Sequence, residues 1–229
     1  AIAAAGLTDP LQRQTRRVVR PAAGSTLPRT GFALLTAVVV FLAALYPVFA
    51  IPAKIADRYA PDAPAGLDGL AYMRFATRID GPPNSERVFP LRHDYEAIRW
   101  MQANVAGSPV IVEAGTGGLL YRWGARFSIY TGLPAVVGWD WHQRQQRAAL
   151  TDRVVLDRQT DVDAFYNTES VDLANILLAR YNIRFVVVGD LEAAYYARPG
   201  LDKFERMADL GYLRRAYANE GTRIYAVVE

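Results

Sequence analysis

The longest hydrophobic stretch of the chain runs from Gly31 to Ile51, and its 21 residues contain no charged side chain. At about 1.5 Å per residue, a helix of this length spans roughly 30 Å, the thickness of a membrane's hydrocarbon core. Residues 1–30 carry five arginines and one acid. By the positive-inside rule we expect a basic cytoplasmic arm at 1–30, a transmembrane helix at 31–52 and an extracytoplasmic chain beyond it. The predicted location is the cell membrane, with the lipid bilayer as a partner.

Two other interpretations of this stretch remain open. Residues 48–50 resemble the small-residue cleavage site of a secretory signal peptide, although about thirty residues precede the apolar run. A buried core helix is the second alternative, although such a helix usually keeps a polar face. Pro47 and Pro52 lie near the end of the run, where we expect the helix to bend or stop.

Prolines and glycines are dense in residues 53–93. Because these residues interrupt regular structure, the segment predicts a neck without long helices or strands. Within it, Leu67–Met73 is apolar enough to pack on a core.

Residues 94–229 alternate between helical and strand-like hydrophobic patterns, which predicts a separate folded domain. Asp94 is the expected N-cap of its first helix. The alternation and a closing hairpin predict an α/β fold: a three-layer domain with a mixed sheet and a C-terminal antiparallel hairpin. We expect helices at residues 94–105, 141–150, 162–166, 171–181 and 201–210, and strands at 109–113, 126–130, 135–137, 184–188, 213–217 and 223–228.

Composition removes several classes of function. The chain has no cysteine, which excludes disulfides, thiol nucleophiles and iron–sulfur clusters. Its net charge of +3 comes from the arm, and the rest is close to neutral, so we expect no nucleic-acid partner. His93 and His142 are its two histidines, so the sequence predicts no metal site, and it indicates no cofactor.

A run of six residues combines two indoles with an acid, an imidazole and a cation. It contains Trp139, Asp140, Trp141, His142 and Arg144. Indole faces stack on the C–H surfaces of sugars, and charged groups bind hydroxyls or phosphate. We therefore consider Trp139, Asp140, His142 and Arg144 candidate sugar-binding residues. The alternative is structural, with tryptophans that anchor a loop and charges that cap or pair nearby.

Two acids each come directly after an apolar strand, Glu113 and Asp190. If these strands are parallel, both carboxylates lie at the sheet edge where α/β proteins place ligands. Asp140 is a third candidate there, and paired carboxylates would suit acid/base work or substrate binding. The alternative is that these acids cap helices or form salt bridges with Arg122 or Arg126.

A glycine-rich loop comes immediately after the first of these strands. Gly115, Gly117 and Gly118 could present backbone N–H groups to an anion. The alternative is a tight turn that needs positive φ angles.

Three segments together carry a family resemblance: GLDGLAYM, DYEAIRWMQANVAGSPVIVEA and FSIYTGLPAVVGWDWHQRQQR, between Gly66 and Arg147. They resemble the C-terminal extracytoplasmic part of the YYY membrane proteins, an uncharacterised polytopic family. Two later segments, ILLARYNIRFVVVGDLE and GTRIYAVV, are similar to the C-terminal end of the same family. The most specific of these motifs is TGLPAVVGWDWHQRQQR.

The resemblance implies a relationship to GT-C glycosyltransferases, which act on polyprenyl-linked sugars at the outer face of a membrane. Those enzymes keep their catalytic acids between early membrane helices, whereas this sequence has one apolar segment. We therefore expect a glycosyltransferase-like extracytoplasmic domain that is not catalytic as this chain alone. The alternative is a single-pass accessory subunit that packs on other transmembrane helices and caps a membrane complex.

Overall fold

The computed structural model describes residues 26–58, 62, 64 and 66–228. Most of the predicted basic arm (1–30) lies outside these residues. The chain forms two compact units, 1–57 and 58–229, and each is described by itself.

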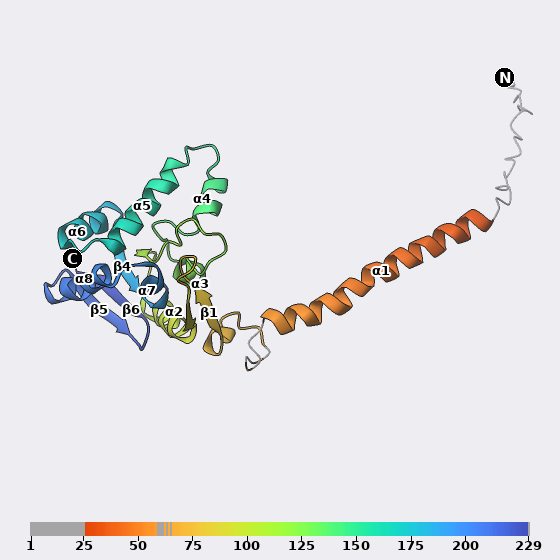
Figure 1. Ribbon diagram of the computed structural model, residues 1–229, viewed down its shortest axis with the longest axis horizontal. Helices are drawn as coiled ribbons and strands as arrows, with labels where there is room; N and C mark the ends of the chain where they lie inside the picture. The colour runs from red at the N-terminus through yellow and green to blue at the C-terminus, as the bar shows by residue number, and fades with distance from the viewer. Residues whose placement is uncertain (1–25, 59–61, 63, 65, 229) are drawn as a thin grey trace, which may run out of the picture. The chain divides into compact units, whose positions relative to one another are not determined.

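The first unit contains helix α1 (Thr26–Arg58) (Figure 1). Its segment Pro28–Asp57 is long and apolar enough to cross a membrane, and none of its most apolar window is buried. This exposure contradicts the buried-helix interpretation, whereas a signal sequence and a membrane anchor both fit. The helix continues through Pro47 and Pro52, so it stops at neither proline, and a bend there stays a prediction.

A four-stranded mixed sheet lies at the centre of the second unit. Its strand order is β3-β4-β6-β5. β3 pairs with β4 in parallel, whereas β6 is antiparallel to both β4 and β5. The predicted mixed sheet and C-terminal hairpin are confirmed. The strands are β3 (Val110–Val112), β4 (Ile183–Val188), β5 (Leu213–Ala218) and β6 (Arg223–Val227).

Helices cover both faces of this sheet, as the predicted three-layer arrangement requires (Figure 1). Ile224 and Tyr225 are neighbours on β6 and therefore point to opposite faces. The ring of Tyr225 lies 6.1 Å from that of Phe204 on α8. Tyr217, which pairs with Ile224, lies 5.5 Å from Trp100 on α2. The helices of this unit are α2 (Arg92–Asn104), α3 (Arg126–Thr131), α4 (Asp140–Gln146), α5 (Arg153–Asn167), α6 (Val171–Arg180), α7 (Asp190–Tyr195), α8 (Arg198–Asp209) and the 3-10 helix η1 (Ala71–Arg74).

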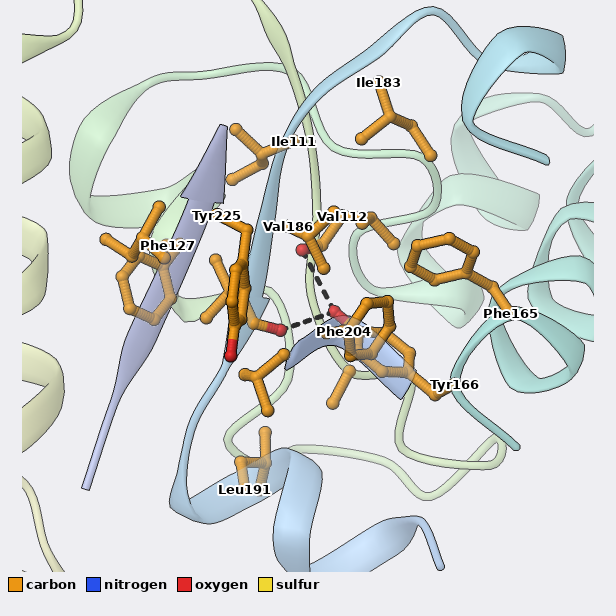
Figure 2. Close-up of a cluster of buried hydrophobic side chains, with 14 of the residues drawn as sticks. Ile111, Val112, Phe127, Phe165, Tyr166, Ile183, Val186, Leu191, Phe204 and Tyr225 are labelled. Atoms are coloured by element: carbon orange, nitrogen blue, oxygen red, sulfur yellow. Dashed lines mark hydrogen bonds between the residues drawn. The ribbon is translucent and has the colours of Figure 1, made fainter. Parts of the chain in front are cut away.

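Aromatic side chains fill the layer between the sheet and helices α5 and α8. Figure 2 shows Phe165, Tyr166, Phe204 and Tyr225 packed together over β4 and β6. The hydroxyl of Tyr166 lies 2.7 Å from the carbonyl oxygen of Val187 and 3.1 Å from that of Val112. These contacts satisfy a buried hydroxyl where the two parallel strands meet.

The expected strand at 126–130 is wrong, because these residues form helix α3. The carboxylate of Glu113 accepts hydrogen bonds from the N–H groups of Phe127 and Ser128, both at 2.9 Å. These N–H groups lie in the first turn, where a helix supplies no acceptors of its own. The expected strand at 135–137 is reduced to a single parallel bridge between Ala135 and Ile111.

Asp94 is not the N-cap of α2. The helix begins at Arg92 after Leu91, and Asp94 lies buried inside its first turn. Its carboxylate instead accepts hydrogen bonds from Arg126 at 2.7 Å and from the indole N–H of Trp123 at 2.8 Å.

The neck predicted at 53–93 contains a two-stranded hairpin that the sequence pattern does not predict, β1 (Thr77–Asp80) and β2 (Arg87–Pro90). Asp80 attaches it to the rest of the unit. This fully buried carboxylate accepts from the N–H of Trp123 at 2.7 Å, the N–H of Gly81 at 2.8 Å and the hydroxyl of Tyr195 at 2.8 Å. The packing expected of Leu67–Met73 is present at Met73, which is fully buried, whereas Leu67 is exposed.

Lys203 is buried in the aromatic layer, and its ammonium group lies 3.9 Å from the ring centroid of Phe204. Burial lowers its pKa from 10.5 to about 7. Because the folded state disfavours the charged form, this group makes the protein less stable as the pH falls from 10.5 to 7. We expect Lys203→Met to raise the free energy of unfolding at pH 7 by about 1–3 kcal/mol, with a smaller gain at pH 10. Chemical denaturation at both pH values measures this difference, and an equal gain at both would contradict the titration argument.

Candidate functional site

A shallow groove of about 10 Å³ lies at the start of α4. Its small volume suits contact with one face of a ligand and not enclosure of a whole molecule. The structure brings three of the predicted sugar-binding residues, Trp139, Asp140 and His142, into this groove. The residues that line it are Leu119, Leu120, Tyr121, Trp139, Asp140, Trp141 and His142.

The aromatic rings of the groove are held by defined contacts. The indole N–H of Trp139 donates to the carbonyl oxygen of Gly124 at 2.8 Å. His142 packs edge-on against Trp139 at 5.2 Å and against Tyr121 at 6.3 Å. Trp139 and Trp141 nevertheless remain 37% and 42% exposed. The groove therefore presents fixed but solvent-accessible aromatic surface.

Arg144 lies beside the groove and not in its lining. Its guanidinium lies 5.0 Å from the ring centroid of Trp141 and 3.6 Å from the carboxylate of Asp140. Its Nε is buried and has no hydrogen-bond partner in the described part of the chain. The pair places a carboxylate and a guanidinium next to the exposed indoles.

The condition that the two acid-bearing strands are parallel is met, and Glu113 and Asp190 both lie just beyond the carboxyl ends of β3 and β4. Their surroundings differ. Glu113 caps α3 and lies 3.6 Å from Arg126. Burial raises the pKa of Glu113 to about 7, although Arg126 opposes this shift. These contacts fit the alternative interpretation, in which Glu113 caps a helix and forms a salt bridge with Arg126.

Arg126 lies at the centre of a buried ionic cluster. Its Nε is 2.7 Å from Asp94, and its Nη2 is 2.8 Å from Glu192 on α7. With Glu113, three carboxylates from three parts of the chain surround one guanidinium, and all four side chains are buried. Because solvent and substrate cannot reach the cluster, its geometry serves the fold.

Asp190 pairs with His93. From the sequence alone we consider His93 only as a possible metal ligand. The carboxylate of Asp190 lies 2.7 Å from Nδ1 of His93. Burial raises the pKa of Asp190, and the hydrogen bond to His93 opposes the shift. The two residues are 97 positions apart, so no local signal predicts the pair. Within the described chain no hydrogen bond or ion pair joins Asp140 to Glu113 or Asp190, and a grouping of the three acids stays a prediction.

The glycine-rich loop forms a turn with two positive φ angles, +57° at Gly117 and +76° at Gly118. These angles fit the tight-turn interpretation. The N–H of Gly115 is already bonded to the Tyr196 hydroxyl at 3.0 Å. An anion nest at Gly115, Gly117 and Gly118 stays a prediction. In the portion of the chain that is described, no group of three or more His, Cys, Asp or Glu side chains could hold a metal ion.

No family model matches the chain, and no curated protein matches it. Among solved structures, the chain is similar to the crystal structure of the C-terminal globular domain of an oligosaccharyltransferase from Archaeoglobus fulgidus. The sequence identity is 16%, and the match covers 58% of this chain and 95% of that one, with a TM-score of 0.37.

Proposed function

We propose that the globular unit is the extracytoplasmic domain of a membrane protein that handles lipid-linked sugars, and that the groove around Trp139 and Trp141 contacts the saccharide. The observation that carries the proposal is the pair of partly exposed indoles, Trp139 and Trp141, beside a charged pair. We assign the Arg126 cluster no catalytic step, since its side chains are buried and closed to substrate.

The chemistry of the groove supports a sugar ligand. Pyranose rings have one apolar C–H face and a rim of hydroxyls. The indoles of Trp139 and Trp141 offer apolar surface for that face, and the carboxylate of Asp140 and the guanidinium of Arg144 offer an acceptor and a donor for the rim. The groove is too small to enclose a sugar ring, so the saccharide would lie on the exposed indole faces.

The apolar helix α1 supports the membrane context. It precedes the domain in the same chain, and it exposes apolar side chains along its described length. Such a surface needs lipid or other apolar helices around it. A lipid-linked saccharide also requires a domain that works at a membrane surface.

We expect Trp141→Ala to weaken saccharide binding about tenfold, because it removes stacking surface worth roughly 1.4 kcal/mol. The measurement is calorimetric titration of the full chain with the saccharide released from a lipid-linked donor, in a polyoxyethylene detergent that carries neither sugar nor phosphate. The matched control is Tyr212→Ala, which removes a similarly exposed ring outside the groove. Equal affinities of Trp141→Ala and the unaltered protein would contradict the proposal.

The accessory-subunit alternative rests on α1 itself. Ala33, Ala37 and Ala44 lie on it, and small residues four apart allow close helix packing in membranes. Purification in mild detergent and then mass spectrometry of the intact chain distinguishes the two. Stoichiometric protein companions favour the subunit role, whereas a lone chain that retains a polyprenyl sugar favours sugar handling.

A further inference from the structure

A second depression lies beside the same helix that forms the groove. It is a cleft of about 290 Å³, close to the lower limit of small-molecule sites. α4 contributes Asp140 and Trp141 to the groove and Gln143 to this cleft. Arg147, the first residue after α4, also lines the cleft. The residues that line the cleft are Ser128, Pro134, Ala135, Val136, Val137, Gly138, Gln143, Arg147, Val154, Val155 and Arg158.

The charge of the cleft is positive. Its lining includes two arginines and no acidic side chain. Arg147 donates to the carbonyl and side-chain oxygens of Gln143. Arg158 donates to the carbonyl oxygen of Val136 at 3.2 Å and lies over the ring of Tyr181 at 5.3 Å. Within the described residues, neither guanidinium has a carboxylate partner, so each keeps N–H donors for a ligand.

The position of the cleft in the fold is also that of a ligand site. The segment at Ala135 runs parallel to β3 through its bridge with Ile111, and the cleft includes the next residues along the chain, up to Gly138. Open α/β sheets bind ligands beyond the carboxyl ends of their parallel strands. Ser128 adds a half-buried hydroxyl to the lining.

We propose that this cleft binds a phosphate or diphosphate group. A guanidinium is planar and presents paired N–H donors that match phosphate oxygens, and the hydroxyl of Ser128 supplies a further donor. The assignment rests on the proposed function. In that proposal a sugar ring lies against the groove at the start of α4, and the anion in the cleft is the phosphate that links the same saccharide to its lipid.

The first test is calorimetric titration of the full chain with inorganic pyrophosphate in the same polyoxyethylene detergent. We expect Arg147→Gln and Arg158→Gln each to weaken binding at least tenfold, since each removes charge-assisted hydrogen bonds. The control is Arg153→Gln, which alters an exposed arginine of α5 that pairs with Asp157. No binding by the unaltered protein, or equal affinity in Arg147→Gln, would overturn the proposal.

A second titration identifies the source of the anion. Farnesyl diphosphate carries the same group on a short polyprenyl chain. If the protein binds it more tightly than inorganic pyrophosphate, and Arg147→Gln loses this binding, the anion belongs to a lipid headgroup. Equal binding of both probes indicates a soluble phosphate. Trp141→Ala separates this inference from the proposed function. If that variant loses saccharide but the arginine variants keep pyrophosphate binding, the cleft proposal fails and the groove proposal stands.

Discussion

Replacement of Arg126 by Met is expected to lower the free energy of unfolding by about 3–5 kcal/mol, because it leaves buried carboxylates without their counter-charge. Asp94, Glu113 and Glu192 all lie within 3.6 Å of this guanidinium. Without it they must be protonated or hydrated, and either change costs stability.

The measurement is denaturant unfolding of the full chain in detergent, monitored by near-ultraviolet circular dichroism. Arg198→Met is the matched control, since that arginine is 90% exposed and its ion pair with Asp202 at 3.6 Å is a surface contact. We expect the control to change stability by less than about 0.5 kcal/mol. Similar losses in the two variants would show that the buried cluster is not what stabilises the fold.

The second large effect is a dependence of stability on pH that originates at Glu113. Its pKa rises from 4.5 to about 7 in the folded protein, so the folded state holds a proton that the unfolded state releases. The contribution is therefore fully present below pH 4.5 and is lost as the pH rises through 7. We expect the loss to be about 2–3 kcal/mol across this window.

Glu113→Gln tests this effect, because the amide does not titrate. The variant is less stable at acid pH, since one of its two contacts to the N–H groups of Phe127 and Ser128 is lost. Its stability should nevertheless fall less steeply than that of the unaltered protein between pH 4.5 and 7. Other groups, among them Asp190, titrate in both proteins and cancel in the comparison. Parallel pH curves would refute the assignment to Glu113.

Much of the sheet can be predicted from local patterns in the sequence. The run at 184–188 and the closing hairpin have strong hydrophobic periodicity, and they are strands in the structure. The sequence leaves the pairing of β3 with β4 open; in the structure it is parallel and places Glu113 and Asp190 at one edge. The strands themselves depend on residues close together in the chain, whereas the pairing of β3 with β4 joins Val110 to the distant Ile183.

The errors arise where a distant residue decides the local structure. Residues 126–130 alternate like a strand, but the carboxylate of Glu113, 14 and 15 positions from the N–H groups that it binds, caps them as a helix. The local pattern makes Asp94 a cap of its own helix, but Arg126, 32 positions away, binds it. Single-sequence patterns contain no information about such pairs.

The same distinction holds for the candidate site. Trp139, Asp140 and His142 are nearly contiguous, so their chemistry is visible in the sequence. Tyr121 and Arg158 are not predicted, because the loop before α3 and the helix α5 reach the site only through folding. An arginine without a carboxylate partner indicates a binding site only when the residues around it in space are known.

We expect the hairpin of β1 and β2 to affect how the domain resists mechanical force. Tension that enters from the N-terminal side of the chain first meets the buried side chain of Met73 on η1. Once that side chain is released, the tension reaches β1 at Thr77, which pairs with Pro90 at the open end of the hairpin. A pull there separates the pairs one after another instead of shearing them together. The three hydrogen bonds of Asp80, at the far end of β1, are then where extension halts, so this carboxylate would act as the mechanical clamp of the domain.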